Sequence, residues 1–149
     1  MRTRTVEFLA ILLMALALVP AGAHFLELPG KIGLGRDAYF AVQQIYPGWA
    51  PFRIVLFGTL VVNVILSALL REDRMAFVFA VGAVVAVLVI FAIFFSWIFP
   101  ANQATADWTR PTEDWELLRR NWEYSHAVNA LVTLLGFCSV TLAALTSSR

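Results

Sequence analysis

Residues 75–99, MAFVFAVGAVVAVLVIFAIFFSWIF, decide the fold of this chain. The stretch carries no charge, and it is longer than the ~20 apolar residues that cross the ~30 Å hydrocarbon core of a membrane. The charged turn Arg71-Glu-Asp-Arg74 precedes it, and residues 54–70 before that turn are again apolar. Such a short turn joins antiparallel neighbours, so the two segments predict a helical hairpin. Pro100 is expected to end the second helix of this hairpin.

The composition extends this prediction to the whole chain. Of the 149 residues, 60% are hydrophobic and only 14% are charged, whereas about a quarter of a soluble domain is charged. We therefore expect one all-α domain, residues 1–149, folded as an integral membrane four-helix bundle with spans at about 6–28, 54–70, 75–99 and 126–145. Alternatively, the first segment is a signal peptide cleaved after Ala23, which would make His24 the new N-terminus.

Two polar connections separate these apolar segments. In the first connection, Asp37 is expected to cap a short interfacial helix at about residues 38–45. In the second, Thr112 is expected to cap a helix that begins near Glu113, where acidic residues suit the helix dipole. This helix would extend the fourth span beyond the membrane by an amphipathic segment at about residues 113–125.

Four spans place both termini on one side of the membrane. The short segments on that side contain Arg2, Arg4, Arg71, Arg74 and Arg149, while the longer connections contain Lys31, Arg36, Arg53, Arg110, Arg119 and Arg120. The positive-inside rule then favours cytoplasmic termini by density of charge, although not by number. The chain has no basic block, so nucleic acid is not an expected partner.

Two Glu/His pairs stand at corresponding places in the first and fourth spans. His24 and Glu27 are three residues apart, as are Glu123 and His126, so each pair shares one helix face. The two spans run in opposite directions, and each glutamate lies nearer water than its histidine. The four side chains therefore form a cluster if these two helices touch. Glu116 and Arg120, like Arg119 and Glu123, are four residues apart, so each pair can form an ion pair on the predicted helix.

Three kinds of site remain open for His24, Glu27, Glu123 and His126. They could bind one transition metal ion, such as iron, copper or zinc, through imidazole and carboxylate ligands. They could work without metal as an acid/base or ligand site, in which each glutamate orients an imidazole. They could also be a structural polar network that locks the two helices together.

An aromatic stripe beside His126 suggests a binding pocket. Trp115, Trp122 and Asn129 recur on the His126 face of the predicted helix, and Asn102 directly follows the third span. Flat apolar walls with a few polar groups suit a lipophilic small molecule, so these residues are candidate substrate contacts. The alternatives are tryptophan anchors at the membrane interface and asparagines that hydrogen-bond between helices.

Several stretches of the chain together resemble the anthrone oxygenase-like family of small four-helix membrane proteins. They are His24-Phe-Leu-Glu27-Leu-Pro29-Gly-Lys31, Ala41-Val-Gln-Gln-Ile-Tyr46, Pro100-Ala-Asn102, Asp114-Trp-Glu-Leu-Leu-Arg119 and Trp122-Glu-Tyr-Ser-His126. The resemblance covers nearly the whole chain, and it is most specific around the two histidines.

The resemblance implies an oxidoreductase, a monooxygenase that oxidises an anthrone to an anthraquinone. In that case His24 or His126 would be the base, Glu27 and Glu123 would orient it, and Trp122 would stack on the substrate. The competing hypothesis is a non-catalytic metal- or quinone-binding membrane protein, or an accessory subunit. The expected partners are membrane lipids and a lipophilic small molecule, with a homo-oligomer or a larger membrane complex as further alternatives.

Overall fold

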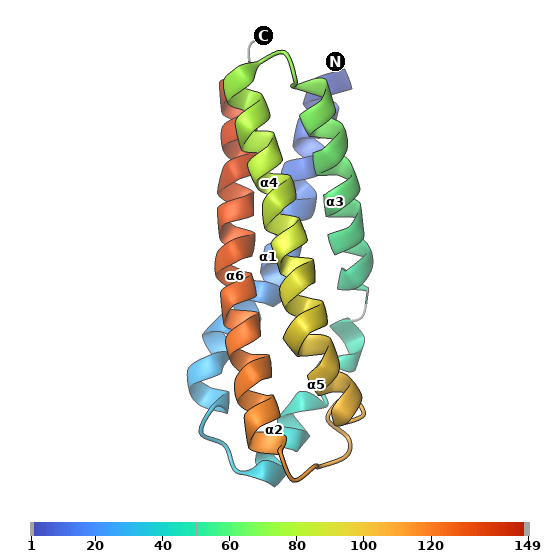
Figure 1. Cartoon of the computed structure of the whole chain (residues 1–149), viewed down its shortest axis with the longest axis vertical. Coiled ribbons are helices and arrows are strands. Elements are labelled where there is room, and N and C mark those ends of the chain that lie inside the picture. The colour runs from blue at the N-terminus through green and yellow to red at the C-terminus, as the bar shows by residue number, and fades with distance from the viewer. Residues whose placement is uncertain (1, 50, 148–149) are drawn as a thin grey trace.

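Four long helices form the body of the protein, which a computed structural model describes for residues 2–49 and 51–147. They are α1 (Arg2–Lys31), α3 (Phe52–Leu69), α4 (Arg74–Ile93) and α6 (Trp115–Thr146). α1 packs against α3 and α6, and α4 packs against the same two helices, so the four close into a ring with both termini at one end (Figure 1). The described residues contain helices and turns but no strand. The expectation of an all-α chain is confirmed, with four helices long and apolar enough to cross a membrane.

Small side chains let the four helices approach closely. The core of the bundle consists largely of alanines from α1, α4 and α6, together with Met14, Leu66, Val87 and Val140. The helices approach closely at Gly136, where an added Cβ would lie 2.9 Å from the Cβ of Ala86. Close packing through small residues is typical of helix pairs in membranes, where side chains gain little by leaving lipid.

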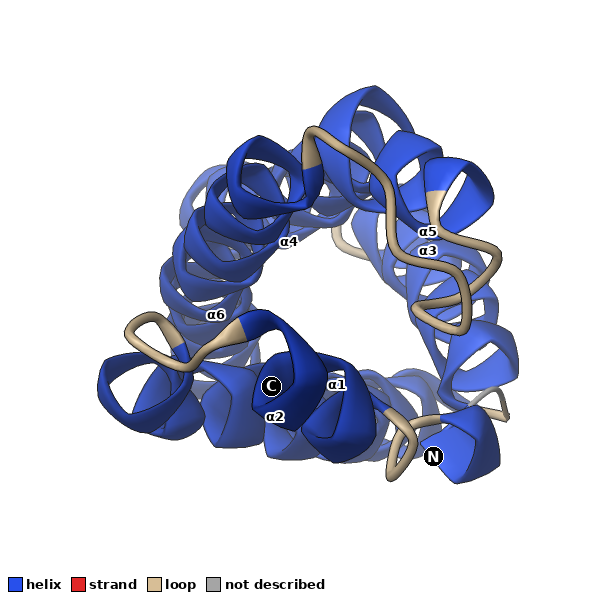
Figure 2. Ribbon diagram, turned by 90° about the horizontal axis from the view of Figure 1, so that it is seen from below, coloured by secondary structure: helices blue, strands red, loops and turns tan. Residues whose placement is uncertain are grey.

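Short elements close the end of the bundle opposite the termini. α2 (Arg36–Gln43) and the 3₁₀ turn η1 (Pro47–Trp49) follow α1, and α5 (Phe99–Ala104) precedes the loop to α6. Seen from that end, α2 lies in front of the long helices (Figure 2). A second core forms here, and it is mainly aromatic: Tyr39, Phe40, Ile98, Ala101, Trp108 and Trp122. The molecule therefore has an aliphatic core along the bundle and a separate aromatic core at one end.

Pro100 does not end the third long helix, so this prediction is wrong. α4 continues through the π-helical segment η2 (Phe94–Ile98) into α5, and the backbone N–H of Phe99 bonds to the carbonyl of Phe94, five residues earlier. Pro100 lies in the first turn of α5, where a missing N–H costs little. The wider π turn therefore carries the helix past the proline and brings Asn102 to the end of the bundle.

Three other predicted helix boundaries also differ from the structure. α1 runs through Pro29 to Lys31 instead of ending near residue 28. The short helix begins at Arg36, and Asp37 lies inside its first turn rather than at its N-cap. α6 begins at Trp115, so Asp114 and not Thr112 holds the N-cap position. Each difference is small, but the extension of α1 changes which residues reach the candidate site.

A left-handed turn connects α5 to the loop before α6. Ala106, Asp107 and Trp108 have φ angles of 49°, 54° and 61°, a conformation that costs a non-glycine residue about 1–2 kcal/mol. The backbone N–H of Trp108 donates to Thr105 Oγ1 at 3.0 Å, and the buried indole of Trp108 packs against Tyr39. Tertiary contacts thus hold the turn and direct Trp108 into the aromatic core.

Candidate functional site

The last two turns of α1 present three polar side chains on one face. His24, Glu27 and Lys31 follow one another at spacings of three and four residues, which places them on one side of a helix. Pro29 lies between them and removes one backbone hydrogen bond. Packing against α6 and the ion pairs of Lys31 compensate for this loss, so the helix continues far enough for Lys31 to face the bundle interior.

Contact between α1 and α6 brings the two histidines together. The ring centroids of His24 and His126 are 4.0 Å apart, with the ring planes tilted by 35°. The sequence predicted that the histidines would meet only if these helices touched, and the helices pack along their length. Among the described residues, His24 Nδ1 and His126 Nε2 are buried without a hydrogen-bond partner. The pair therefore presents ring nitrogens in a largely apolar setting.

Aromatic rings surround this imidazole pair. The ring of Trp122 lies 4.2 Å from that of His126 and meets that of His24 at 5.0 Å with perpendicular planes. Tyr46 and Trp49 contact the His24 ring at centroid distances of 4.7 and 5.2 Å. Both come from the connection between α2 and α3, so this connection separates the imidazoles from the surroundings of the protein.

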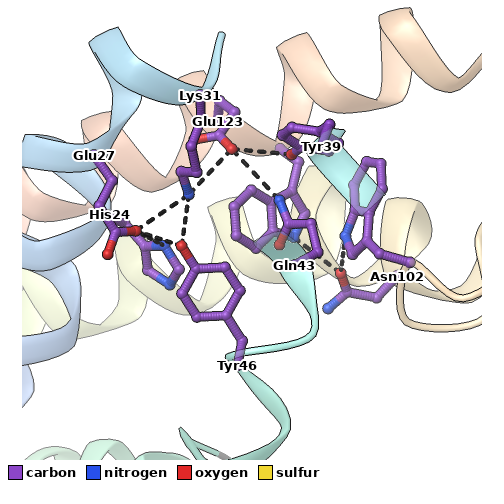
Figure 3. A network of polar contacts seen from close by, with 10 residues as sticks. His24, Glu27, Lys31, Tyr39, Gln43, Tyr46, Asn102 and Glu123 are labelled. Carbon is purple, nitrogen blue, oxygen red and sulfur yellow. Dashed lines mark hydrogen bonds and ion pairs between the residues drawn. The ribbon is translucent and has the colours of Figure 1, made fainter. Parts of the chain in front are cut away.

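Lys31 lies at the centre of the polar contacts (Figure 3). Its Nζ atom is 3.3 Å from Glu27 Oε2 and 3.2 Å from Glu123 Oε1, and it donates to the Tyr46 hydroxyl at 2.8 Å. An ammonium group has three N–H donors, and these three partners account for all of them. Lys31 therefore joins the two glutamates, which the sequence analysis had assigned to the histidines.

Two tyrosines complete the shell around the glutamates. Tyr39 donates to Glu123 Oε1 at 2.9 Å, Gln43 Nε2 lies 3.5 Å from the same oxygen, and Tyr46 donates to Glu27 Oε2. Burial, reinforced by the Glu123 carboxylate, raises the pKa of Tyr39, and burial together with the Glu27 carboxylate raises the pKa of Tyr46. Both phenols therefore stay protonated and act as hydrogen-bond donors.

The arrangement gives the metal hypothesis no support. Across residues 2–49 and 51–147, no three His, Cys, Asp or Glu side chains are grouped so that they could hold a metal ion. The Lys31 ammonium group lies between the carboxylates of Glu27 and Glu123, where a metal cation would need to bind both. Glu27 Oε2 is 4.0 Å from His24 Nδ1, which is too far for a hydrogen bond.

The predicted substrate contacts lie at different distances from the imidazole pair. Trp122 touches both histidines, and its indole N–H donates to Asn102 Oδ1 at 2.9 Å, so Asn102 holds the tryptophan in place. Asn129, one turn beyond His126 on α6, is buried. Trp115 lies farther out, beside Tyr39 and a surface cavity of about 350 Å³.

The spacing allowed Arg119 to pair with Glu123, but the structure gives the two side chains other partners. Its guanidinium group donates to the backbone carbonyl of Leu34 and stacks on Trp115, with 4.7 Å between Cζ and the ring centroid. Glu123 is fully buried and turns toward Lys31 instead. A helix spacing of four residues permits an ion pair, but here tertiary contacts draw the two side chains to different partners.

Sequence reasoning missed five members of the site: Lys31, Tyr39, Gln43, Tyr46 and Trp49. Lys31 could have been found, because it follows Glu27 by four residues and only the expected helix end at Pro29 excluded it. Tyr39 and Gln43 are also four apart, which places them on one face of the short helix. That this face turns toward Glu123 depends on how α2 folds back, and no local pattern encodes this.

The chain matches no family model, and comparisons with curated proteins and with solved structures find no match either. A four-helix bundle by itself is compatible with many unrelated functions. The function is therefore argued from the geometry and chemistry of this site.

Proposed function

We propose that this protein is an integral membrane oxygenase that acts on a lipophilic, anthrone-like aromatic compound by metal-free acid/base chemistry. The observation that carries the proposal is the contact between the tilted rings of His24 and His126, whose buried ring nitrogens are surrounded by aromatic side chains. A neutral imidazole accepts a proton, and flat aromatic walls favour a planar substrate. The anthrone-like substrate is the one that the resemblance implies.

The surface and the helix lengths support a location in a membrane. Large apolar side chains are exposed on the outward faces of the long helices, among them Leu26, Ile54, Leu135 and Leu145. A surface with so many exposed large apolar side chains suits hydrocarbon rather than water. We place the termini in the cytoplasm, because the short turn between α3 and α4 carries Arg71 and Arg74. A fluorescent protein fused to the C-terminus that fails to fold and fluoresce would contradict this orientation.

The proposed reaction begins with loss of a proton from carbon. An anthrone is acidified by its carbonyl group and flanking rings, and His24 Nδ1 takes the proton from the methylene carbon. The Glu27 carboxylate, 4.0 Å from that nitrogen, stabilises the imidazolium that forms. The carbanion then bonds to dioxygen and gives a peroxide, which takes the proton back from the imidazolium.

The hydroperoxide collapses to the product without a further co-reactant. The remaining C–H proton leaves, the O–O bond breaks, and the carbon–oxygen double bond of the quinone forms as hydroxide departs and is protonated to water. One dioxygen is consumed for each quinone and water released, so dioxygen is the oxidant. His126, in contact with His24, is placed to relay the second proton.

Oxygen uptake tests the proposed reaction. The full chain in lipid nanodiscs should consume dioxygen with anthrone, form anthraquinone at a one-to-one ratio, and keep its rate with a metal chelator present. His24→Gln, which keeps a polar side chain but removes the base, should lower the rate by about 10²–10⁴-fold. The matched control is Asn63→Leu, which changes a buried residue of α3 outside the site. Uptake no faster than in empty nanodiscs, or an unchanged rate in His24→Gln, would overturn the proposal.

A further inference from the structure

A continuous series of aromatic rings runs from the surface to the imidazole pair. The ring of Trp115 borders the surface cavity of about 350 Å³, and the ring of Trp122 contacts both histidines. Consecutive ring centroids lie 6.3, 5.1, 6.0, 5.8 and 5.0 Å apart in the order Trp115, Tyr39, Trp108, Trp122, Tyr46 and Trp49. These separations are typical of packed aromatic pairs, and electrons pass rapidly between rings that lie so close. We call these six residues the aromatic series.

The two tyrosines of the aromatic series each donate a hydrogen bond to a carboxylate (Figure 3). Tyr39 donates to Glu123 Oε1 at 2.9 Å, and Tyr46 donates to Glu27 Oε2. A carboxylate is a base, so it accepts the phenolic proton when the phenol loses an electron. The ring then becomes a neutral tyrosyl radical, and no net charge remains on it. Both tyrosines can therefore give up an electron and a proton together.

The two inner tryptophans of the series contact an amide instead of a carboxylate. The indole N–H groups of Trp108 and Trp122 donate to the same atom, Asn102 Oδ1, at 3.1 and 2.9 Å. An amide oxygen is a far weaker base than a carboxylate, so an indole that loses an electron here keeps its proton and carries a positive charge. The Lys31 ammonium group lies 5.0 Å from the ring centroid of Trp122, and the two positive charges repel each other. An oxidising equivalent on Trp122 is therefore passed to a tyrosine, where the radical is neutral.

The charges around the two tyrosines favour the uptake of one proton. Glu27 and Glu123 each carry a negative formal charge, and the one ammonium group of Lys31 contacts both carboxylates. A proton from Tyr39 or Tyr46 therefore neutralises these three groups as a whole, which lowers the cost of burying their charge. Lys31 Nζ also lies 4.9 Å from the Tyr46 centroid, where it does not repel a neutral radical.

We propose that the aromatic series is an electron-transfer relay that takes up one oxidising equivalent and holds it as a neutral radical on Tyr39 or Tyr46. The partner is a one-electron oxidising radical of the inorganic class to which the azide radical belongs. Such a radical takes one electron from Trp115 or Trp49, the outer rings of the series, and becomes an anion. An electron then moves from a tyrosine to the oxidised tryptophan, the phenolic O–H bond breaks, and a new O–H bond forms on the hydrogen-bonded glutamate. The relay goes beyond the proposed oxygenase, because it requires neither an anthrone nor dioxygen.

Pulse radiolysis with the azide radical tests the relay, because this radical oxidises tryptophan faster than tyrosine near neutral pH. The protein is the full chain in nanodiscs of saturated lipid, as the variant Trp97→Phe/Tyr124→Phe. These residues are the one tryptophan and the one tyrosine outside the series, and both are exposed, at 48% and 51%. The absorbance of the tryptophan radical should decay as that of the tyrosyl radical grows, with one first-order rate constant that does not depend on protein concentration. No tyrosyl growth, or a rate that rises with protein concentration, would overturn the relay.

The reverse variant shows whether the tyrosines of the series are required. Tyr39→Phe/Tyr46→Phe keeps all five tryptophans and leaves Tyr124 as the sole tyrosine. The first-order growth of the tyrosyl radical should be lost in this variant, because Tyr124 lies outside the series. Growth at an unchanged rate would assign the radical to Tyr124 and contradict the proposal.

A third comparison tests the carboxylate as the proton acceptor. In the background Tyr46→Phe/Tyr124→Phe, where Tyr39 is the sole tyrosine, Glu123→Gln should lower the rate constant of tyrosyl formation severalfold. Glu116→Gln, at an exposed position on the same helix, is the matched control and should leave it unchanged. Equal rate constants in all three proteins would contradict proton transfer to Glu123. The background protein should also react more slowly in D₂O, and an equal rate constant there would contradict the coupled proton transfer even if Glu123→Gln does not fold.

Discussion

Lys31 Nζ lies 3.2 Å from Glu123 Oε1, and this ion pair ties the last turn of α1 to the buried face of α6. Glu123 is fully buried and Lys31 is only 4% exposed. A buried ion pair adds little stability compared with two well-packed apolar groups, because desolvation offsets the attraction between the charges. Removal of one partner is much more costly, since it leaves the other charge uncompensated.

Lys31→Met should therefore lower the free energy of unfolding by ~3–5 kcal/mol. The double variant Lys31→Met/Glu123→Gln should recover a large part of this loss, because it removes both charges. Unfolding in detergent by increasing fractions of sodium dodecyl sulfate, followed by tryptophan fluorescence, measures the difference. Arg71→Met, at an exposed position in the turn between α3 and α4, is the control and should change little. A double variant no more stable than Lys31→Met would argue against the ion pair as the cause.

The two buried tyrosines predict how stability depends on pH. The pKa of Tyr39 and that of Tyr46 are raised in the folded protein above the usual value of about 10. The folded state thus keeps protons that the unfolded chain loses, so the stability from these phenols is complete below pH ~10 and falls as the pH rises further. In a spectrophotometric titration, Tyr39→Phe should leave the phenolate absorbance gained near pH ~10 unchanged. A smaller gain in the variant would show that Tyr39 ionises in the ordinary range.

Gly136 should tolerate a methyl group poorly. An added Cβ would lie 2.1 Å from Met14 Cε and 2.9 Å from Ala86 Cβ. Met14 can move, but Ala86 has no side-chain freedom, so the helices must separate. Gly136→Ala should cost ~1–3 kcal/mol of stability. At Gly82 the nearest atom is the Ser139 hydroxyl, 2.7 Å away, which can rotate, so Gly82→Ala should cost less in the same unfolding assay. Equal losses would contradict the packing described at Gly136.

Ala106→Gly should stabilise the protein. Ala106 has a φ angle of 49°, which a glycine adopts without the steric cost that alanine carries. The gain should be ~0.5–1 kcal/mol after the greater freedom of glycine in the unfolded chain is subtracted. Thermal unfolding of the two proteins in the same detergent measures the gain, and a lower midpoint for the variant would show that the turn is not strained at this position.

The apolar pattern predicted most of the bundle, because long uncharged stretches leave few alternatives to helices that pack side by side. The matched depths of His24 and His126 followed from helix direction and the spacing of three residues, whereas the contact between α1 and α6 was only a condition in the sequence analysis and is shown by the structure. Helix ends were predicted less well. Pro29 and Pro100 both lie inside helical segments, since tertiary packing and a π turn outweigh the local cost of a proline.

Part of the polar half of the site was beyond reach from the sequence, although the spacing of Lys31 from Glu27 was visible in it. Its donors come from Lys31, Tyr39 and Tyr46, and the last two lie in a connection whose path is set by the aromatic core. The left-handed turn at Ala106 was not predicted either, because residues 106–108 include no glycine to indicate positive φ angles. Where a site depends on contacts between distant segments, the sequence limits which residues could reach it but does not determine which of them do.

The contact between Tyr39 and Glu123 joins residues that are 84 positions apart in the chain. The ribosome synthesises Glu27, Lys31 and both tyrosines early. The Glu123 carboxylate, which contacts Lys31 and Tyr39, follows only with the last helix. A ribosome must therefore deliver nearly the entire polypeptide before the site exists, and until then Lys31 has only Glu27 and Tyr46 as partners. A chain truncated before α6 would hold three long apolar helices and a charged site without its buried carboxylate.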